Sequence, residues 1–327
     1  MNHRTSLLKM GIIAIVTGAA GAILPMMISS AVVLSLMTQA VIYAVAALGV
    51  GFLLKQNGGV TFGNAMYYGM SGYGISLVSN TLGLSTGPSI IGVILLTGLF
   101  AFCIGFVIVR SPGIAFAMIT LAIGQVFFVM ASKARGVTGG ADGMVVQLSS
   151  SIFGLRSAYF GRPGTMFVIC WITLVIVILI LSILLRTRFG PLTEAIRDNE
   201  ERARFIGFKT LFPRAAIYAI SAMICSIAGI LSALYTTFVS PESLHWSLSG
   251  SFLIAALLGG SSMLIGPVIG AIAYFLLQDV LSEVTSHWLS ILGIWLILVV
   301  VFWPDGISGG LKTIAEKFRL SNSINKS

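Results

Sequence analysis

Long apolar segments follow one another along almost the whole chain, with few charged residues inside them. The 327 residues are 57% hydrophobic and only 9% charged, whereas soluble domains carry about 25% charged residues. A single soluble core could not bury this much apolar surface. The sequence therefore predicts an integral membrane protein, because the bilayer itself solvates apolar side chains.

Seven of these segments have the length of a membrane-spanning helix. A hydrocarbon core of about 30 Å needs about 20 apolar residues per helix. Spans must be helices or closed barrels, since lipid offers backbone groups no partners, and these segments are too long for barrel strands. The seven segments are 10–28, 31–54, 60–79, 87–109, 113–132, 164–185 and 214–238. Although the first resembles a signal peptide, its length and the segment close behind it favour a retained anchor helix.

The uneven distribution of Lys and Arg predicts the orientation. With the N-terminus in the cytoplasm, fifteen of the 19 basic residues fall on the cytoplasmic side, as the positive-inside rule requires. Both termini and the loop 186–213 are then cytoplasmic, and the loop 133–163 is external. The net charge of +9 is explained by the cytoplasmic loops, so no nucleic-acid partner is expected. The four basic residues outside are Lys133, Arg135, Arg156 and Arg162.

The last apolar region, 251–303, has to cross an odd number of times, because it begins outside and ends inside. Three crossings fit if the first is short, at 251–263, 264–280 and 286–303. This gives ten spans, and a re-entrant arrangement with eight is the alternative. We expect an all-α transmembrane bundle of 8–10 spans in one domain, 1–327.

Glycine-rich junctions and a few polar residues are the candidates for a translocation path. Gly58–Thr61 and Gly259–Ser262 interrupt apolar runs in the two halves of the chain, as in transporters built from two related halves. Close helix packing at glycine explains the same pattern equally well. Polar residues inside spans need a partner or a watery cavity. The possible path residues are Asn64, Gln125, Gly259 and Gly260.

No residue pattern indicates catalysis, a metal or a cofactor. The three cysteines lie in apolar runs without a CxxC, and the three histidines are scattered. A membrane transferase would need metal-binding Asp pairs or a His/carboxylate cluster, and the sequence shows neither. A stand-alone secondary carrier is a further alternative, but no carboxylate lies within the seven predicted spans.

One stretch, Arg186–Arg214, contrasts with the rest of the chain because it holds seven basic and four acidic residues. Pro191 can begin a helix and Gly207 can end it, and apolar residues recur between them at helical spacing. Glu200 and Arg204 form an i,i+4 pair. Because connecting loops in bundles usually have two to eight residues, we interpret this long loop, with an amphipathic helix inside it, as a docking site for a cytoplasmic partner.

The loop sequence GPLTEAIRDNEERARFIGF resembles the coupling loop of the membrane subunits of branched-chain amino-acid ABC importers, the LivM-type permeases. Further blocks resemble the same family in the same order: GIAFAMITLAIGQ, TGGADGM, the long segment 240–271, and FWPDGI. The matching loop positions are Gly190, Leu192, Ala195, Ile196, Arg197, Asp198, Asn199, Glu200, Ala203 and Gly207. The chain departs from the family at Pro191, Val60, Thr61 and Ser262.

This resemblance implies a multi-pass permease subunit of the inner membrane that imports branched-chain amino acids, with urea or short amides as alternative solutes. It implies three kinds of partner besides membrane lipid: cytoplasmic ATP-binding subunits, a second homologous permease and an external solute-binding protein. The chain has no phosphate-binding G-x-x-x-x-G-K-[ST] motif, so we expect no ATPase site in it. The implied coupling residues are Glu194, Ile196, Arg197, Asn199, Glu200, Ala203 and Gly207.

Overall fold

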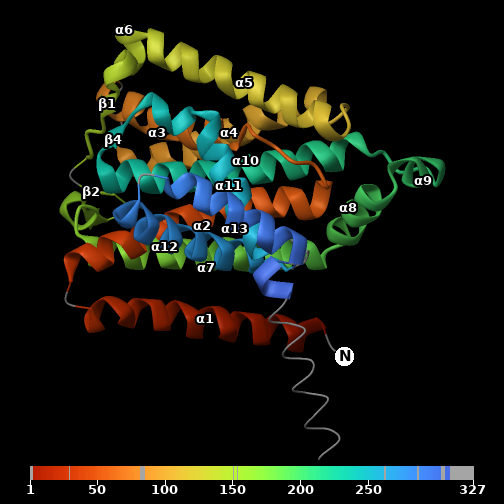
Figure 1. Ribbon diagram of the computed structural model, residues 1–327, viewed down its shortest axis with the longest axis horizontal. Coiled ribbons are helices and arrows are strands. Elements are labelled where there is room, and N and C mark those ends of the chain that lie inside the picture. Colours follow the sequence, from red (N-terminus) through yellow and green to blue (C-terminus); the bar gives the residue numbers. More distant parts are fainter. Residues whose placement is uncertain are drawn as a thin grey trace, which may run out of the picture.

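The chain forms a bundle of long helices, shown by a computed structural model (Figure 1). The structure describes residues 3–309 with short gaps at 29, 82–84, 150, 153, 261–262, 286 and 303–305. The expected all-α membrane bundle is confirmed. Its long helices are α1 (His3–Met27), α2 (Ala31–Asn57), α3 (Asn64–Thr81), α4 (Thr86–Ile108), α5 (Gly113–Lys133), α7 (Pro163–Arg186), α10 (Leu211–Thr236), α11 (Trp246–Gly259), α12 (Gly266–Val284) and α13 (Trp288–Phe302).

Short elements lie at the two ends of the bundle. The helices α8 (Phe189–Asp198) and α9 (Glu200–Phe205) project from one end, and the segment 134–162 covers the other (Figure 1). At that second end β1 pairs antiparallel with β4, with Met144 opposite Val239. The elements there are α6 (Arg135–Thr138), η1 (Gly140–Asp142), β1 (Met144–Val145), β2 (Ser151–Ile152), β3 (Leu155–Arg156), η2 (Ser157–Tyr159), β4 (Phe238–Val239) and η3 (Pro241–Leu244).

Six of the described helices are long and apolar enough to cross a membrane: α2, α4, α5, α7, α10 and α12. The sequence predicted ten spans, and each predicted span does contain a helix. The other four differ in length or composition. The apolar parts of α1, α11 and α13 are only Ala14–Met27, Trp246–Gly259 and Ser290–Val299. α3 has 18 residues but includes several Ser, Asn and Gly residues.

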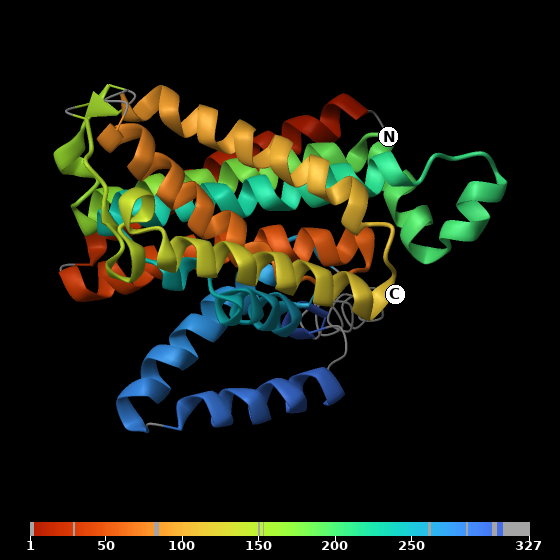
Figure 2. The ribbon, with the colours of Figure 1, turned by 90° about the horizontal axis from the view of Figure 1, so that it is seen from above.

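The region 251–303 folds into three helices, as in the ten-span prediction. α12 runs antiparallel to α2, because Pro267 lies against Gly51 while Tyr274 stacks on Tyr43, with ring centroids 5.7 Å apart. α13 then returns toward the end that carries α8 (Figure 2). With 14 residues, α11 is about 21 Å long, which is shorter than a hydrocarbon core of about 30 Å.

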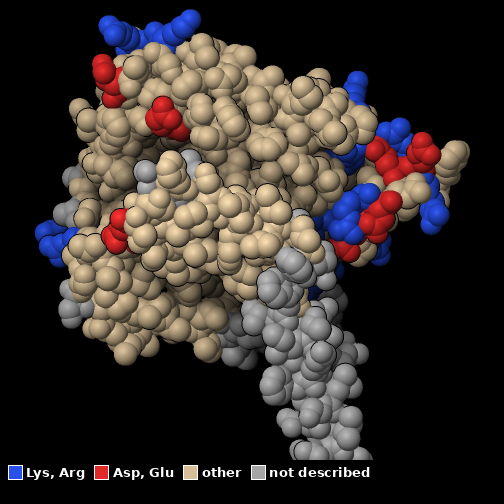
Figure 3. Space-filling model, in the orientation of Figure 1, with Lys and Arg blue, Asp and Glu red and all other residues tan. Residues whose placement is uncertain are grey.

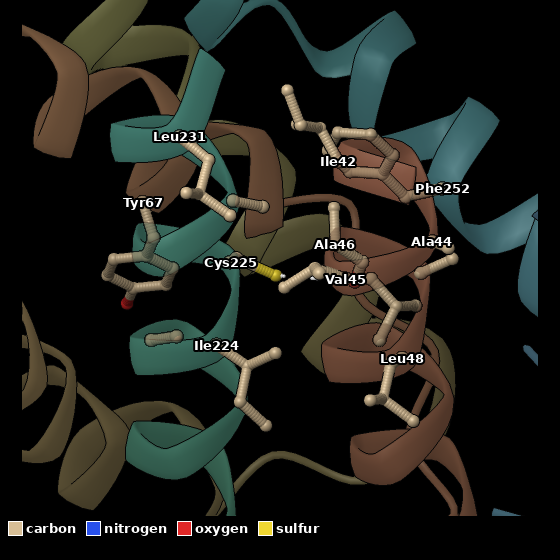
Figure 4. Close-up of a cluster of buried hydrophobic side chains, with 14 of the residues drawn as sticks. Ile42, Ala44, Val45, Ala46, Leu48, Tyr67, Ile224, Cys225, Leu231 and Phe252 are labelled. Atoms are coloured by element: carbon tan, nitrogen blue, oxygen red, sulfur yellow. Dashed lines mark hydrogen bonds between the residues drawn. The ribbon is translucent and has the colours of Figure 1, made fainter. Parts of the chain in front are cut away.

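Two helices, α2 and α10, form the centre of the molecule. In α10, 78% of the apolar window is buried, and in α2 56%, against 22–28% in α4, α5, α7 and α12. Small residues let their backbones approach: Gly49 faces the Ser221 carbonyl, and the Cys225 thiol lies 3.6 Å from the carbonyl oxygen of Ala46. Figure 4 shows the apolar cluster around Cys225, with Val45 and Ile224 from the two helices facing each other.

Charged side chains gather at the two ends of the bundle. In Figure 3 an uncharged belt separates the charges on α8 and α9 from those at the opposite end. This is the distribution of a protein whose middle lies in lipid. It also puts the loops 133–163 and 186–213 at opposite ends, as the sequence predicted. The basic residues of the C-terminal tail, such as Lys312 and Lys317, lie outside the described residues.

Candidate functional site: the polar loop and the buried path residues

The polar loop folds into two short helices where the sequence predicted one. α8 ends at Asp198 and α9 begins at Glu200, with the extended backbone of Asn199 between them, at φ −158° and ψ 97°. The Asn199 side chain caps α9 by accepting a hydrogen bond from the amide nitrogen of Arg202 at 2.9 Å. Gly207, at φ +96°, ends the second helix as expected.

One side of the loop packs onto the bundle. Ile196 and Ala203 are buried, with 3% and 5% of their surface exposed, and Thr193 is buried beside them. Gly190 lies so close to α7 that a Cβ there would overlap the carbonyl of Leu185. The amphipathic pattern therefore seats both helices on the end of the bundle.

Hydrogen bonds tie this side of the loop to the last residues of α2. The hydroxyl of Thr193 donates to Oε1 of Gln56 at 2.6 Å, and Nε2 of Gln56 donates to Glu194 at 3.3 Å. Arg197 donates to the backbone carbonyl of Lys55 at 2.6 Å and also pairs with Asp198 at 2.7 Å. Gln56 is buried, so these bonds replace water that the side chain has lost.

Glu200 is the centre of a second set of bonds. Its two carboxylate oxygens pair with Arg204 and Arg214, each at 2.5 Å, and accept a hydrogen bond from Thr210 at 2.9 Å. Partial burial acts to raise the pKa of Glu200, but the Thr210 bond and the charges of Arg214 and Arg204 outweigh it and lower the pKa. Arg214 in turn donates to Oδ1 of Asn57 at 2.9 Å, which links α9 and α10 to α2.

The other side of the loop presents apolar side chains outward. Phe205 is 90% exposed, Ile206 69% and Phe208 50%. An exposed apolar cluster rimmed by charges is typical of a protein interaction site. Beside it opens a hollow of about 500 Å³, lined by Phe106, Arg204, Phe208, Lys209, Thr210, Leu211 and Phe212. These aromatic residues were not predicted from the sequence, although a hydrophobic run within a charged loop is a visible signal.

The seven expected coupling residues therefore divide by position. Ile196 and Ala203 are buried against the bundle, and Glu194 and Glu200 are half-buried and bonded within the chain. The remaining three are exposed: Arg197, Asn199 and Gly207. Most of the group holds the loop in place, and the outward apolar cluster offers the larger free surface.

Two of the four possible path residues lie near each other. Asn64 is the first residue of α3 and is fully buried, with Nδ2 3.4 Å from the hydroxyl of Ser221. Gln125 lies on α5 next to Gly124, which faces Gly63. Oδ1 of Asn64 and Oε1 of Gln125 are buried and have no hydrogen-bond partner within the described part of the chain.

The other two, Gly259 and Gly260, end α11 against α12. A Cβ on Gly259 would overlap the carbonyl of Gly266. Gly260 has φ +88°, a conformation that L side chains rarely adopt. These glycines permit close helix packing, which is the alternative that the sequence left open. Whether any of the four residues lines a path stays a prediction.

Buried hydroxyl groups surround Asn64, and the sequence did not reveal them. Ser249 accepts a hydrogen bond from the amide nitrogen of Ala65 at 2.7 Å, and Ser221 donates to the Gly49 carbonyl at 2.8 Å. The hydroxyls of Tyr67 and Tyr218 lie 3.1 Å apart. Serines and tyrosines are common in membrane helices, so only the fold shows that these come together from α3, α10 and α11.

A multi-pass helical bundle with a buried polar centre and a structured polar loop at one end is the architecture expected of a membrane transport subunit. Residues 32–301 match the family described as the permease component of the branched-chain amino acid transport system, and the chain belongs to that family. It is thus a membrane-spanning permease component of the ABC-transporter type, and the expected multi-pass, inner-membrane location agrees with this. The family match begins after α1.

Several characterised relatives span most of the chain. The permease protein LivM of the high-affinity branched-chain amino acid transport system of Escherichia coli K12 is 23% identical over 92% of this chain and 75% of its own length. Its counterpart in Salmonella typhimurium is 24% identical, over 86% and 71%. The autoinducer 2 import system permease protein LsrC of Salmonella paratyphi B is 31% identical, over 59% and 55%. No solved structure matches the chain.

Proposed function

We propose that the chain carries branched-chain amino acids into the cell and is driven by separate ATP-binding subunits that dock on the loop 190–207. The observation that supports this most is the exposed cluster of Phe205, Ile206 and Phe208, on a loop whose other side is bonded to the bundle. A loop built in this way can transmit force, because a partner protein would bind its exposed side while its other side is bonded to the bundle. Branched-chain amino acids are the proposed solute because the E. coli relative belongs to such a system.

Each proposed partner is assigned to one part of the permease. The ATP-binding subunits would meet the apolar cluster, and the charges around it would orient the docking. A second homologous permease would complete the membrane part, and a solute-binding protein would deliver the amino acid at the end formed by the loop 133–163. ATP-driven closure would shift the permease between two conformations by binding one of them more tightly.

Replacing Phe205 with Asp tests the docking role. The side chain is 90% exposed, so the change leaves the fold intact but puts a charge where an apolar contact is proposed. The few aromatic residues that anchor an interface each cost about 2 kcal/mol or more when they are truncated. We expect at least a tenfold loss of the ATP-binding subunits that co-purify with the tagged chain. ATP-dependent leucine uptake into proteoliposomes should fall with it.

Val137→Asp is the matched control, because Val137 is also an exposed apolar residue, 56% exposed, but lies on α6 at the opposite end. It should leave co-purification unchanged. Normal recovery of ATP-binding subunits with the Phe205 variant would rule out docking through this cluster. If the complex took up urea in place of leucine, the permease function would stand and the proposed solute would be wrong.

A further inference from the structure

Three consecutive residues at the end of α2 are held by the loop and by the first turn of α10. Lys55 is bonded through its carbonyl to Arg197, Gln56 to Thr193 and Glu194, and Asn57 to Arg214. We name Lys55, Gln56 and Asn57 together with these contacts the α2 anchor. The bonds come from α8 and, through the Arg214–Glu200 pair, from α9. Both helices of the loop are thus fastened to one short segment.

The chain directly after the α2 anchor leads into the buried polar centre. Residues 58–63 are not helical, and Gly58 has φ +68°, with the stem of Arg197 close above it. The segment passes along α5, where the amide nitrogen of Phe62 donates to the Thr120 hydroxyl at 3.3 Å. It ends at Asn64, the candidate path residue. A non-helical link of six residues therefore joins the loop to the polar centre.

We propose that the α2 anchor transmits the motion of the loop to the segment 58–63 and so to the path around Asn64. This inference rests on the proposed function, since it needs a partner that moves the loop. Gln56 and Thr193 are each 1% exposed, and Asn57 is 8% exposed. Breaking the contact would leave Oε1 of Gln56 and Oδ1 of Asn57 without these partners in a buried site, which is unfavourable. The Thr193 hydroxyl also lies 3.0 Å and 2.9 Å from the carbonyl oxygens of Phe189 and Gly190. The loop and the end of α2 consequently move together, and the segment 58–63 pivots at Gly58 and carries the displacement to Asn64.

Thr193→Val tests the transmission. Valine keeps the shape of the side chain but cannot donate to Gln56. In the complex with its ATP-binding subunits and solute-binding protein, reconstituted in proteoliposomes, we expect normal co-purification and normal basal ATP hydrolysis. Leucine uptake per ATP hydrolysed should fall at least tenfold, because the ATP-binding subunits would hydrolyse ATP without moving the residues around Asn64. Thr193→Ser, which retains a hydroxyl, should restore the ratio.

Thr187→Val provides the matched control. Its hydroxyl also lies in the loop, but it bonds only locally, to the carbonyl of Leu184 at 2.7 Å and the amide nitrogen of Phe189 at 3.3 Å. The uptake ratio of this variant should equal that of the wild type. If Thr193→Val does not fold, Gln56→Met serves instead. Gln56 lies on α2, outside the loop, and methionine removes its bonds to Thr193 and Glu194.

The outcomes separate the two proposals. An unchanged ratio of uptake to hydrolysis in the folded variant overturns the transmission role and leaves docking intact. Loss of co-purification in Thr193→Val also overturns it, since this side of the loop would then contribute to docking. If no ATP-binding subunit co-purifies even with the wild-type chain, the proposed function itself fails.

Discussion

Glu200 shows how far a local pattern can be followed at the scale of a residue. The spacing of Glu200 and Arg204 predicted an ion pair, and the structure contains it at 2.5 Å. The second partner, Arg214, is fourteen residues away and belongs to another helix, so no local rule could name it. What looks in the sequence like a solvated surface charge is a junction between α9, α10 and, through Asn57, α2.

Lowering the pH should destabilise α9 by protonating Glu200. A carboxyl group with a lowered pKa in the folded chain contributes stability that is complete above its unfolded pKa of about 4.3. That stability is lost as the pH falls through the lowered folded value. We expect protection of the α9 amides against hydrogen exchange to fall below about pH 4.3 in the wild type. In Glu200→Gln the protection should already be weaker at pH 7, and this acid step should be absent.

Glu201→Gln is the control for that experiment, because Glu201 is the exposed neighbour on the same helix. Its protection profile should follow the wild type. A Glu200→Gln profile identical to the wild type at both pH values would show that the carboxylate does not hold α9.

At the scale of elements, apolar length was enough to place the helices but not their ends. The predicted span 60–79 begins four residues late, at Asn64, because the residues before it follow Gly58 in a non-helical path. The loop helix is broken at Asn199 because its side chain caps a new helix there. Capping residues also occur inside helices, so the sequence alone did not locate the break.

The contacts between helices could not be predicted either, because composition does not tell which glycine packs against which backbone segment. Gly229 on α10 lies against α3, and a Cβ there would overlap the carbonyl of Tyr68. Gly229→Ala should therefore force α10 away from α3 and destabilise the bundle by about 1–3 kcal/mol, the usual cost of overpacking. Thermal unfolding in detergent should show a lower Tm.

Gly92→Ala gives the comparison, because Gly92 also lies within a membrane helix, α4, but a Cβ there would meet no atom within 4 Å. Its Tm should stay the same or rise, since alanine favours the helix more than glycine does. Equal Tm values for the two variants would contradict the close α3–α10 contact.

At the scale of the whole molecule, the arrangement of charge and of contacts favours one direction of transmission. The central helices α2 and α10 each have one end at the loop, and the polar groups of Asn64, Ser221 and Ser249 lie beside them. Under the proposed coupling, a displacement at that end would reach the centre through the end of α2 and the segment 58–63. The sequence predicted the bundle and a structured polar loop, and the roles of that loop and of Asn64 stay predictions. The convergence of α2, α10 and the loop arises only from tertiary packing.

This direction requires the loop to face the cytoplasm, which thiol labelling in intact cells can test. Ala195 and Asp142, both exposed but at opposite ends, are replaced by cysteine one at a time in a chain in which the exposed Cys103 is replaced by Ser and the buried Cys170 and Cys225 are kept. Because the basic residues concentrate at the loop end, a membrane-impermeant maleimide should modify the cysteine at 142 directly. It should reach the cysteine at 195 only after the membrane is permeabilised. Labelling of position 195 in intact cells would place the loop outside and exclude cytoplasmic ATP-binding subunits as its partners.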